Sequence, residues 1–159
     1  MKRNKPGNQL FWKIITTFGG AGYSPFAPGT AGSLVALIPL FVINEFSVKV
    51  DYWILSLIVI FTILGIIGSF KVEKEWGKDP QKIVVDEAVG MWISIYLLPF
   101  RWYFILPAFL LFRFFDIFKP LGIEKSQRLP GGYGVMGDDI LAGIATNLIL
   151  QAILVMYLK

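Results

Sequence analysis

The stretch YWILSLIVIFTILGIIGSF, residues 52–70, decides the fold class of this chain. It contains 19 residues without a charge or a proline. A helix of about 20 residues crosses the hydrocarbon core of a bilayer, which is about 30 Å thick. The stretch therefore predicts a membrane-spanning helix, and the rest of the chain is interpreted from it.

Two further apolar segments flank this stretch. Residues 140–158 add 19 uncharged residues and predict the last span. The run 34–43 is too short by itself, so the first span must also take in residues 30–33 and 44–46. The chain is expected to form a single-domain, all-α, polytopic membrane bundle over residues 1–159, with Gly-rich loops at the membrane interface. The polar interruptions of the last segment are Thr146, Asn147 and Gln151.

The apolar segment at residues 88–112 is interrupted by Pro99. Because proline ends or kinks a helix, the segment is either one kinked span or a hairpin of two short helices that turns at residues 98–101. A single span would put the charges before and after it on opposite sides of the membrane. A hairpin returns them to the same side, and it is required if they form one site. Its arms then begin near Val84 and run to Phe118.

Lysine and arginine gather at two flanks of the apolar segments. Residues 2–13 carry four of them and residues 71–82 carry four more, whereas the loop 45–51 carries only Lys49. Basic flanks stay in the cytoplasm, so both are expected there. With the hairpin the chain makes about five crossings, with a cytoplasmic N-terminus and an outside C-terminus.

The composition restricts the chemistry. Hydrophobic residues make up 55% of the chain and charged residues 16%, and the chain has no Cys and no His. These absences exclude disulfides, thiol nucleophiles, Cys/His zinc sites and Ser-His-Asp triads. The net charge of +4 is scattered along an apolar chain and does not indicate a nucleic-acid partner. Any reaction must use carboxylates, Lys, Arg, hydroxyls or a metal ion.

Acidic residues form clusters at the ends of apolar segments. Asp86 and Glu87 are adjacent at the start of one segment, where they either bind a cation or cap a helix and offset its dipole. Arg113, Asp116 and Lys119 are spaced i, i+3, i+6 and share one side of a helix that ends before a proline. They form either a functional stripe or an ion network within the helix, with the basic side chains snorkelling.

The third cluster joins glycines to carboxylates. Four glycines in residues 131–137 precede Asp138 and Asp139. Glycine lets backbone amides approach a ligand, and carboxylates bind hard cations, so the segment predicts a metal-phosphate site or, alternatively, a turn with an N-capping Asp. The Gly/Pro-rich residues 18–33 are expected to be an irregular loop at the membrane interface or along a polar cavity, with Thr30 and Ser33 offering hydroxyls to a phosphate.

The clusters together predict phosphoryl chemistry with Mg²⁺. Their carboxylates come from three regions of the chain and lie beside basic residues and Gly-rich segments, all at one predicted membrane face. Magnesium prefers a few carboxylates together with water and phosphate oxygens, and it activates a bound water. A reaction of this kind needs no histidine.

Four motifs follow one another over residues 18–145. They are GYSP at 22–25 with PGTAGS at 28–33, VDEAVGMW at 85–92, FRFFDIFKP at 112–120 and GGYGVMGDDILAG at 131–143. In this order they resemble the phosphatidylglycerophosphatase A family. The resemblance implies a Mg²⁺-dependent phosphomonoesterase of the bacterial inner membrane, which takes phosphatidylglycerophosphate from the surrounding lipid and releases phosphatidylglycerol and phosphate.

The hypothesis for the site gives each group a role. Three aspartates hold Mg²⁺, an acid orients the attacking water, and two cations bind the phosphate oxygens. Hydroxyls and backbone amides complete the phosphate cradle. The metal ligands are Asp86, Asp138 and Asp139; the water is oriented by Glu87 or Asp116; the cations are Arg113 and Lys119; the cradle consists of Thr30, Ser33, Gly131, Gly132 and Gly134.

Two other functions fit the same acidic residues. A Mg²⁺-dependent lipid headgroup transferase would also gather aspartates at the cytoplasmic face, but the chain lacks that enzyme's run of four spaced aspartates. A small cation transporter or channel would place its carboxylates near the membrane midplane. Here the acids lie at the ends of apolar segments, which disfavours an ion path.

Overall fold

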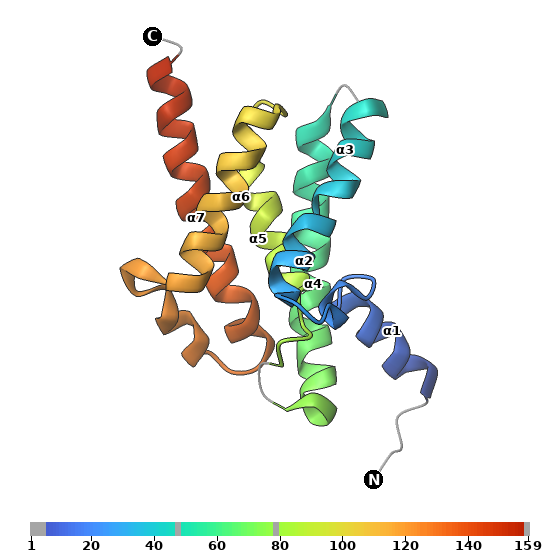
Figure 1. Ribbon diagram of the computed structural model, residues 1–159. Coiled ribbons are helices and arrows are strands. Elements are labelled where there is room, and N and C mark those ends of the chain that lie inside the picture. The colour runs from blue at the N-terminus through green and yellow to red at the C-terminus, as the bar shows by residue number, and fades with distance from the viewer. Residues whose placement is uncertain (1–5, 47–48, 78–79, 158–159) are drawn as a thin grey trace.

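The computed structural model describes residues 6–46, 49–77 and 80–157, and every regular element in these ranges is a helix (Figure 1). The predicted all-α fold is confirmed. Two short 3₁₀ segments, η1 (Ala21–Tyr23) and η2 (Pro120–Arg128), accompany the α-helices. The α-helices are α1 (Pro6–Thr16), α2 (Pro28–Val35), α3 (Leu37–Phe46), α4 (Val50–Trp76), α5 (Val85–Ile95), α6 (Trp102–Phe118) and α7 (Gly132–Tyr157).

Three helical stretches are long and apolar enough to cross a membrane: Pro28–Phe46, which joins α2 to α3, then α4, then α7. These stretches contain the predicted spans, except for Leu158, which lies outside the described residues. Both long helices exceed their apolar runs, since α4 continues to Trp76 and α7 begins at Gly132. The extensions lie at the end of the bundle where α1 also lies (Figure 1). The chain is thus a helical membrane bundle.

The first span has a break at Ala36, between α2 and α3. Pro39 in α3 has no N–H to donate to the carbonyl of Val35, so one backbone hydrogen bond of the helix is missing there. The expectation of an irregular loop over residues 18–33 is wrong for its last six residues, because α2 begins at Pro28. Proline is well tolerated in the first turn of a helix, where its missing N–H costs nothing.

Helices α5 and α6 form the predicted hairpin. They are joined by residues 96–101, so the expected turn at 98–101 is confirmed, and α6 ends at Phe118 as expected. Lys119, the residue before Pro120, has φ +44° and ends the helix. At 1.5 Å per residue α5 is about 16 Å long, which is short for a bilayer crossing. The count of five crossings therefore stays a prediction.

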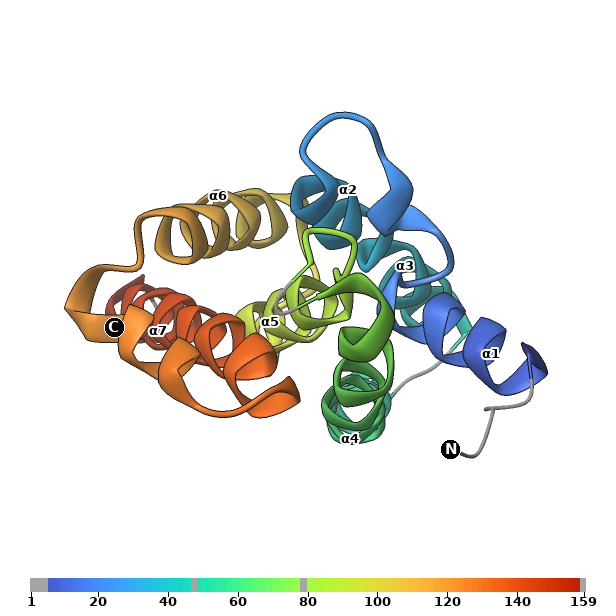
Figure 2. The ribbon, with the colours of Figure 1, turned by 90° about the horizontal axis from the view of Figure 1, so that it is seen from below.

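Helix α5 is the centre of the bundle. It packs against α2, α4, α6 and α7, and most of its residues are buried (Figure 2). The indole N–H of Trp92 donates to the carbonyl of Ala36 at 2.7 Å, and the rings of Phe18 and Phe61 stand edge-on to the indole. These contacts tie α5 to the break in the first span.

Glycines bring α5 and α7 into backbone contact. A Cβ built on Gly143 would lie 2.6 Å from the carbonyl oxygen of Gly90, and a Cβ on Gly90 would lie 2.8 Å from the carbonyl oxygen of Asp139. No larger residue fits either position without separating the helices. The close approach puts the acidic start of α5 beside the acidic second turn of α7.

Candidate active site

The seven charged residues singled out from the sequence line one polar cavity of about 470 Å³. The first turn of α5, the last turns of α6 and the second turn of α7 supply them, and the loop before α2 forms another wall. The hairpin brings the end of α6 back to the start of α5, which explains the convergence. The charged lining residues are Asp86, Glu87, Arg113, Asp116, Lys119, Asp138 and Asp139.

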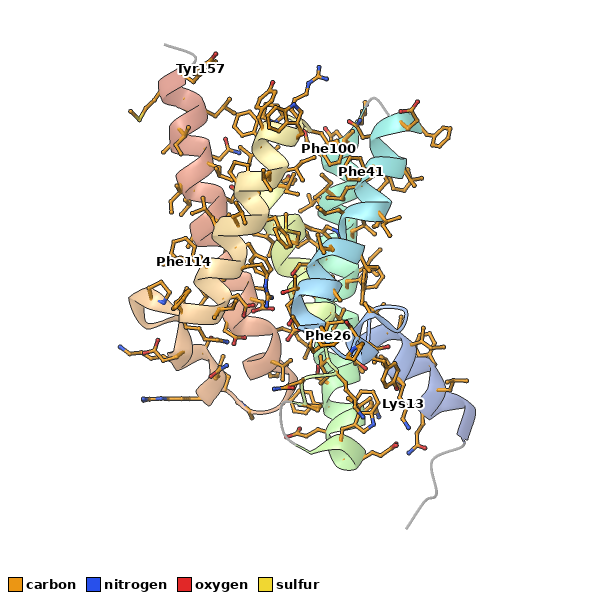
Figure 3. The ribbon with its side chains drawn as sticks, viewed as in Figure 1. Lys13, Phe26, Phe41, Phe100, Phe114 and Tyr157 are labelled. Carbon is orange, nitrogen blue, oxygen red and sulfur yellow. The ribbon has the colours of Figure 1, made fainter. Side chains whose placement is uncertain are left out.

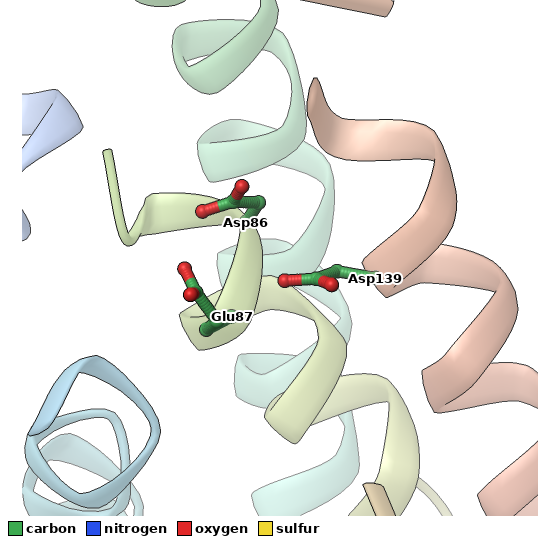
Figure 4. Close-up of side chains that lie close together, drawn as sticks. All are labelled: Asp86, Glu87 and Asp139. Carbon is green, nitrogen blue, oxygen red and sulfur yellow. The ribbon is translucent and has the colours of Figure 1, made fainter. Parts of the chain in front are cut away.

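Three carboxylates form a compact group within the cavity. Asp86 and Glu87 on α5 and Asp139 on α7 point toward one another (Figure 4), and each offers one oxygen within 4.8 Å of the others. Asp86 Oδ1 and Glu87 Oε2 are buried and have no hydrogen-bond donor among the described residues. Buried like charges at this spacing repel unless a cation or a proton joins them. We call these three residues the carboxylate triad.

Asp138 is held differently from its neighbour Asp139. Its Oδ2 pairs with the Lys119 ammonium and accepts a hydrogen bond of 2.8 Å from Gln127 Nε2. Successive residues on a helix point about 100° apart, so Asp139 faces Asp86 and Glu87 while Asp138 faces the segment after α6. The predicted metal set of Asp86, Asp138 and Asp139 therefore differs from the grouping in the structure, where Glu87 stands in place of Asp138.

Arg113 and Lys119 are shared between acids on several helices. Arg113 Nη1 lies 2.5 Å from Asp116 Oδ2 and 4.0 Å from Glu87 Oε1. Lys119 Nζ lies 3.9 Å from Asp116 Oδ1 and also pairs with Asp138. The stripe on α6 is thus partly the internal ion network considered above, but it extends to α5 and α7.

The charge state of Lys119 follows from its surroundings. Burial by itself lowers the pKa of this ammonium, but the hydrogen bond to Asp138 and the nearby carboxylates outweigh burial and raise the pKa above its ordinary value. Lys119 is therefore charged at neutral pH. Lys119 and Arg113 thus supply two cations at the cavity. The Nε of Arg113 is buried and has no acceptor in the described part of the chain.

The predicted hydroxyl donors do not line the cavity. Ser33 is fully buried, and its hydroxyl donates to the carbonyl of Gly29 at 2.9 Å within α2. Thr30 is half-buried one turn from the start of the same helix and is not part of the cavity wall. Ser33 lies one helical turn after Gly29 on the same face of α2, but its hydroxyl is already used by the carbonyl of Gly29.

The predicted glycine cradle is a packing site in the structure. Gly131 and Gly134 line a separate cavity of about 30 Å³. A Cβ on Gly132 would lie 2.2 Å from the carbonyl oxygen of Ile66, so this glycine lets α7 begin against α4. The expectation of an open Gly-rich loop here is wrong from Gly132 onward, where the chain is already helical.

The sequence interpretation missed several cavity residues, and two of them lie against the charged groups. Gly29 in α2 faces Glu87 and Arg113, and Gln127 in η2 fixes Asp138. Gly29 belongs to a quoted motif, but its approach to Glu87 depends on how α2 packs against α5, which the motif does not show. Gln127 lies in a polar 3₁₀ segment with no pattern that marks it.

We expect Gly29→Ala to lower phosphate release at least about 100-fold while the melting temperature changes little. The added Cβ would lie 2.1 Å from Glu87 Oε1 and 3.0 Å from Arg113 Nη1, and both groups are ends of flexible side chains that can swing out of place. Gly137→Ala is the matched control, since its Cβ would meet Ser126 Cβ at 3.3 Å, outside the charged group. Equal activity of both variants would contradict a role for the Gly29 contact.

The arrangement suits the binding of an anionic ester beside a divalent cation. Hard oxygen ligands lie on one side and two cations on the other, within a cavity large enough for a headgroup. The donor set contains oxygen only, which fits Mg²⁺ better than a soft metal.

Comparisons with known proteins find relatives that are named as lipid phosphatases. A protein of Bacteroides thetaiotaomicron that carries the name "Putative phosphatidylinositol-3-phosphatase" is 46% identical over 143 residues, which cover 86% of this chain and 89% of the relative. Proteins named phosphatidylglycerophosphatase A from Escherichia coli and Haemophilus influenzae are each 37% identical, covering 89% and 84% of this chain and 83% of each relative. No solved structure matches the chain.

The family comparison covers the whole cavity. The model of the phosphatidylglycerophosphatase A family matches residues 14–154, a range that contains every charged residue of the site. Together with the relatives, this match makes the chain a phosphatase of membrane lipid metabolism. The helices, the shared acidic cavity and the match over nearly the full length lead to one assignment: the chain belongs to the phosphatidylglycerophosphatase A family.

Proposed function

We propose that the protein hydrolyses the phosphomonoester of phosphatidylglycerophosphate with the help of Mg²⁺, giving phosphatidylglycerol and inorganic phosphate. The observation that carries the proposal is the carboxylate triad facing Arg113 and Lys119 in one cavity. Five acids and two bases line this cavity, so it holds three more negative than positive groups when all are ionised. An anionic phosphate would be repelled by that excess unless a divalent cation joined it.

The residues that would hold the ion are Asp86, Glu87 and Asp139. Bound Mg²⁺ would neutralise the phosphate charge and lower the pKa of a water molecule. The guanidinium of Arg113 and the ammonium of Lys119 would bind the phosphate oxygens and stabilise the charge that spreads over them in the transition state.

Asp116 and Glu87 take different roles in this arrangement. Both carboxylate oxygens of Asp116 face cations, so it holds Arg113 and Lys119 in position. Glu87 Oε2 has no partner in the described ranges and is free to accept a proton from the attacking water. Of the two acids considered from the sequence, Glu87 is thus the better placed to orient the water.

The headgroup of the substrate is the finer part of the proposal. The family and two relatives carry the phosphatidylglycerophosphatase name, and the third relative is named for a phosphatidylinositol 3-phosphate substrate. Both lipids present a phosphomonoester on a polar headgroup. We put phosphatidylglycerophosphate first and keep phosphatidylinositol 3-phosphate as the second candidate because of the 46% identity.

The test supplies both lipids, separately, to purified protein in detergent with Mg²⁺ and follows inorganic phosphate. We expect release from phosphatidylglycerophosphate with a kcat/KM at least about tenfold above that for phosphatidylinositol 3-phosphate. The reverse preference would make phosphatidylinositol 3-phosphate the substrate in place of phosphatidylglycerophosphate. Absence of release from either lipid would reject the phosphatase proposal for these substrates.

Removal of divalent cations is expected to abolish the activity. Without a counter-ion the triad repels the phosphate, so excess EDTA should reduce phosphate release to the background rate. Added Mg²⁺ should restore the rate, and Ca²⁺, which prefers longer and more numerous oxygen contacts, should restore less. Full activity in EDTA would exclude the proposed metal.

We further propose that the protein lies in the bacterial inner membrane with the cavity at the cytoplasmic face. The basic flanks support this orientation, since Lys13 and Lys82 lie near the cavity end of the bundle. Cysteine accessibility can test it because the chain has no cysteine of its own. Labelling of Phe26→Cys from the cytoplasm and of Tyr157→Cys from the outside is expected, and the opposite pattern would invert the orientation.

A further inference from the structure

We propose that Asn147 and Gln151 are positioning residues for the reaction: their side-chain amides fix α5 along α7 and thereby set the carboxylate triad. The inference rests on the proposed role of the triad in phosphate release. Neither residue touches the cavity, and in the sequence both stand out only as polar interruptions of the last span.

The amides of α7 bind the end of α5. Asn147 Nδ2 donates to the carbonyls of Tyr96 at 2.7 Å and Ser94 at 3.3 Å. Gln151 Nε2 donates to the carbonyls of Leu97 at 3.1 Å and Tyr96 at 3.3 Å. The last carbonyls of a helix have no donor within it, and in a membrane they cannot turn to water. Side chains of α7 therefore supply the hydrogen-bond donors that the last carbonyls of α5 lack.

The two helices carry the acids and these bonds in the same register. Helices α5 and α7 run in the same direction (Figure 1), and eight residues separate Asp86 from Ser94, as eight separate Asp139 from Asn147. At 1.5 Å per residue each interval is about 12 Å. Hydrogen bonds between Asn147 and the end of α5 thus hold Asp86 and Asp139 opposite one another, about 12 Å away along both helices.

The glycine contact between the two levels makes the coupling stiff. Four residues after Asp86, Gly90 touches the backbone of Asp139 and of Gly143, which itself lies four residues after Asp139. Backbones in direct contact slide as rigid bodies, so a shift at Asn147 reaches the triad without being absorbed by flexible side chains. A misplacement of about 1 Å at reacting groups can cost about 100-fold in rate.

The first arm of the test is kinetic. Asn147→Leu keeps the number and branching of the side-chain heavy atoms but removes the donor. We expect kcat to fall about 10- to 100-fold while KM stays within about twofold, because the cations proposed to bind the phosphate lie on α6 and beyond it. Asn147→Gln, which retains the amide, should recover most of the rate. Thr146→Val is the matched control, since Thr146 is buried and its hydroxyl has no partner in the described part of the chain.

The second arm measures the helix register without any substrate. Leu97 and Leu141 are exposed, and the chain has no cysteine, so Leu97→Cys with Leu141→Cys accepts two spin labels and no others. We expect Asn147→Leu to shift or broaden the label-to-label distance distribution and Thr146→Val to leave it unchanged. If Asn147→Leu does not fold, Gln151→Leu, whose bonds lie nearer the exposed turn, takes its place with a smaller expected shift.

The outcomes separate the two proposals. An unchanged distribution in both amide variants, or a kcat loss that Thr146→Val shares, would overturn the positioning role. A kcat loss without any change of register would also reject it, because the amides would then act in another way. If the parent protein releases no phosphate from any lipid, the proposed function fails, but the distance measurement still decides whether the amides set the register.

Discussion

Replacement of Asp139 by asparagine is expected to reduce phosphate release by about 10³-fold or more, a loss of roughly 4 kcal/mol of transition-state stabilisation. Asparagine has the shape of aspartate without its charge. Asp139 is only 3% exposed and reaches the triad from α7, so neither solvent nor a described neighbour on that helix can replace its carboxylate. The measurement is kcat/KM for phosphate release at saturating Mg²⁺.

The stability of the same variant distinguishes a site residue from a structural one. Removing one of three buried like charges relieves repulsion, so the melting temperature of Asp139→Asn should stay the same or rise. Asp138→Asn is the adjacent control: it leaves Lys119 with only the longer 3.9 Å pairing to Asp116, so it should lower stability and cost less activity. Equal activity losses in the two variants would contradict the division between the triad and Asp138.

Replacement of Arg113 by lysine is expected to cost about 100-fold in kcat/KM, although the positive charge is retained. Lysine can balance Asp116, but it lacks the planar guanidinium fork, which in the proposed site would bind two phosphate oxygens at once. The loss should appear in both kcat and KM, because the group binds the phosphate before and during the reaction.

The control for Arg113 is the same substitution outside the cavity. Arg128 is exposed at the end of η2, and Arg128→Lys should leave both kinetic constants unchanged. The melting temperature of Arg113→Lys should remain close to that of the parent, since an ammonium still faces Asp116. A large fall in melting temperature with a proportional loss of active protein would make Arg113 a purely structural ion-pair partner.

Most of the helical framework follows from local sequence. Uncharged runs predict α4 and α7, and the proline at 99 predicts the turn between α5 and α6. Figure 3 labels Phe100 in this turn. Glycine is a poor predictor of where these helices begin. Residues 28–33 and 132–137 are helical because their glycines allow close packing against neighbouring helices, and that gain is invisible in a single segment.

The charged members of the site were predictable from the sequence, but their pairing was not. Charged residues in an apolar chain are costly to bury, so their presence at the ends of apolar segments already indicates a common site. Which acid joins which neighbour depends on helix rotation. Asp138 and Asp139 are adjacent in sequence, yet one binds Lys119 and the other faces Asp86, because a helix turns about 100° per residue.

The sequence alone determined that this chain is a helical membrane protein with acidic and basic residues at one end of its spans. The length of an apolar segment and the placement of charges at its ends are local properties, because the bilayer selects each spanning segment by its own hydrophobicity. Tertiary structure alone decided that Glu87 completes the triad, that Gly29 faces it and that Asn147 secures the end of α5. Those outcomes depend on the rotation and register of helices distant in the chain, which only the packing of their surfaces fixes.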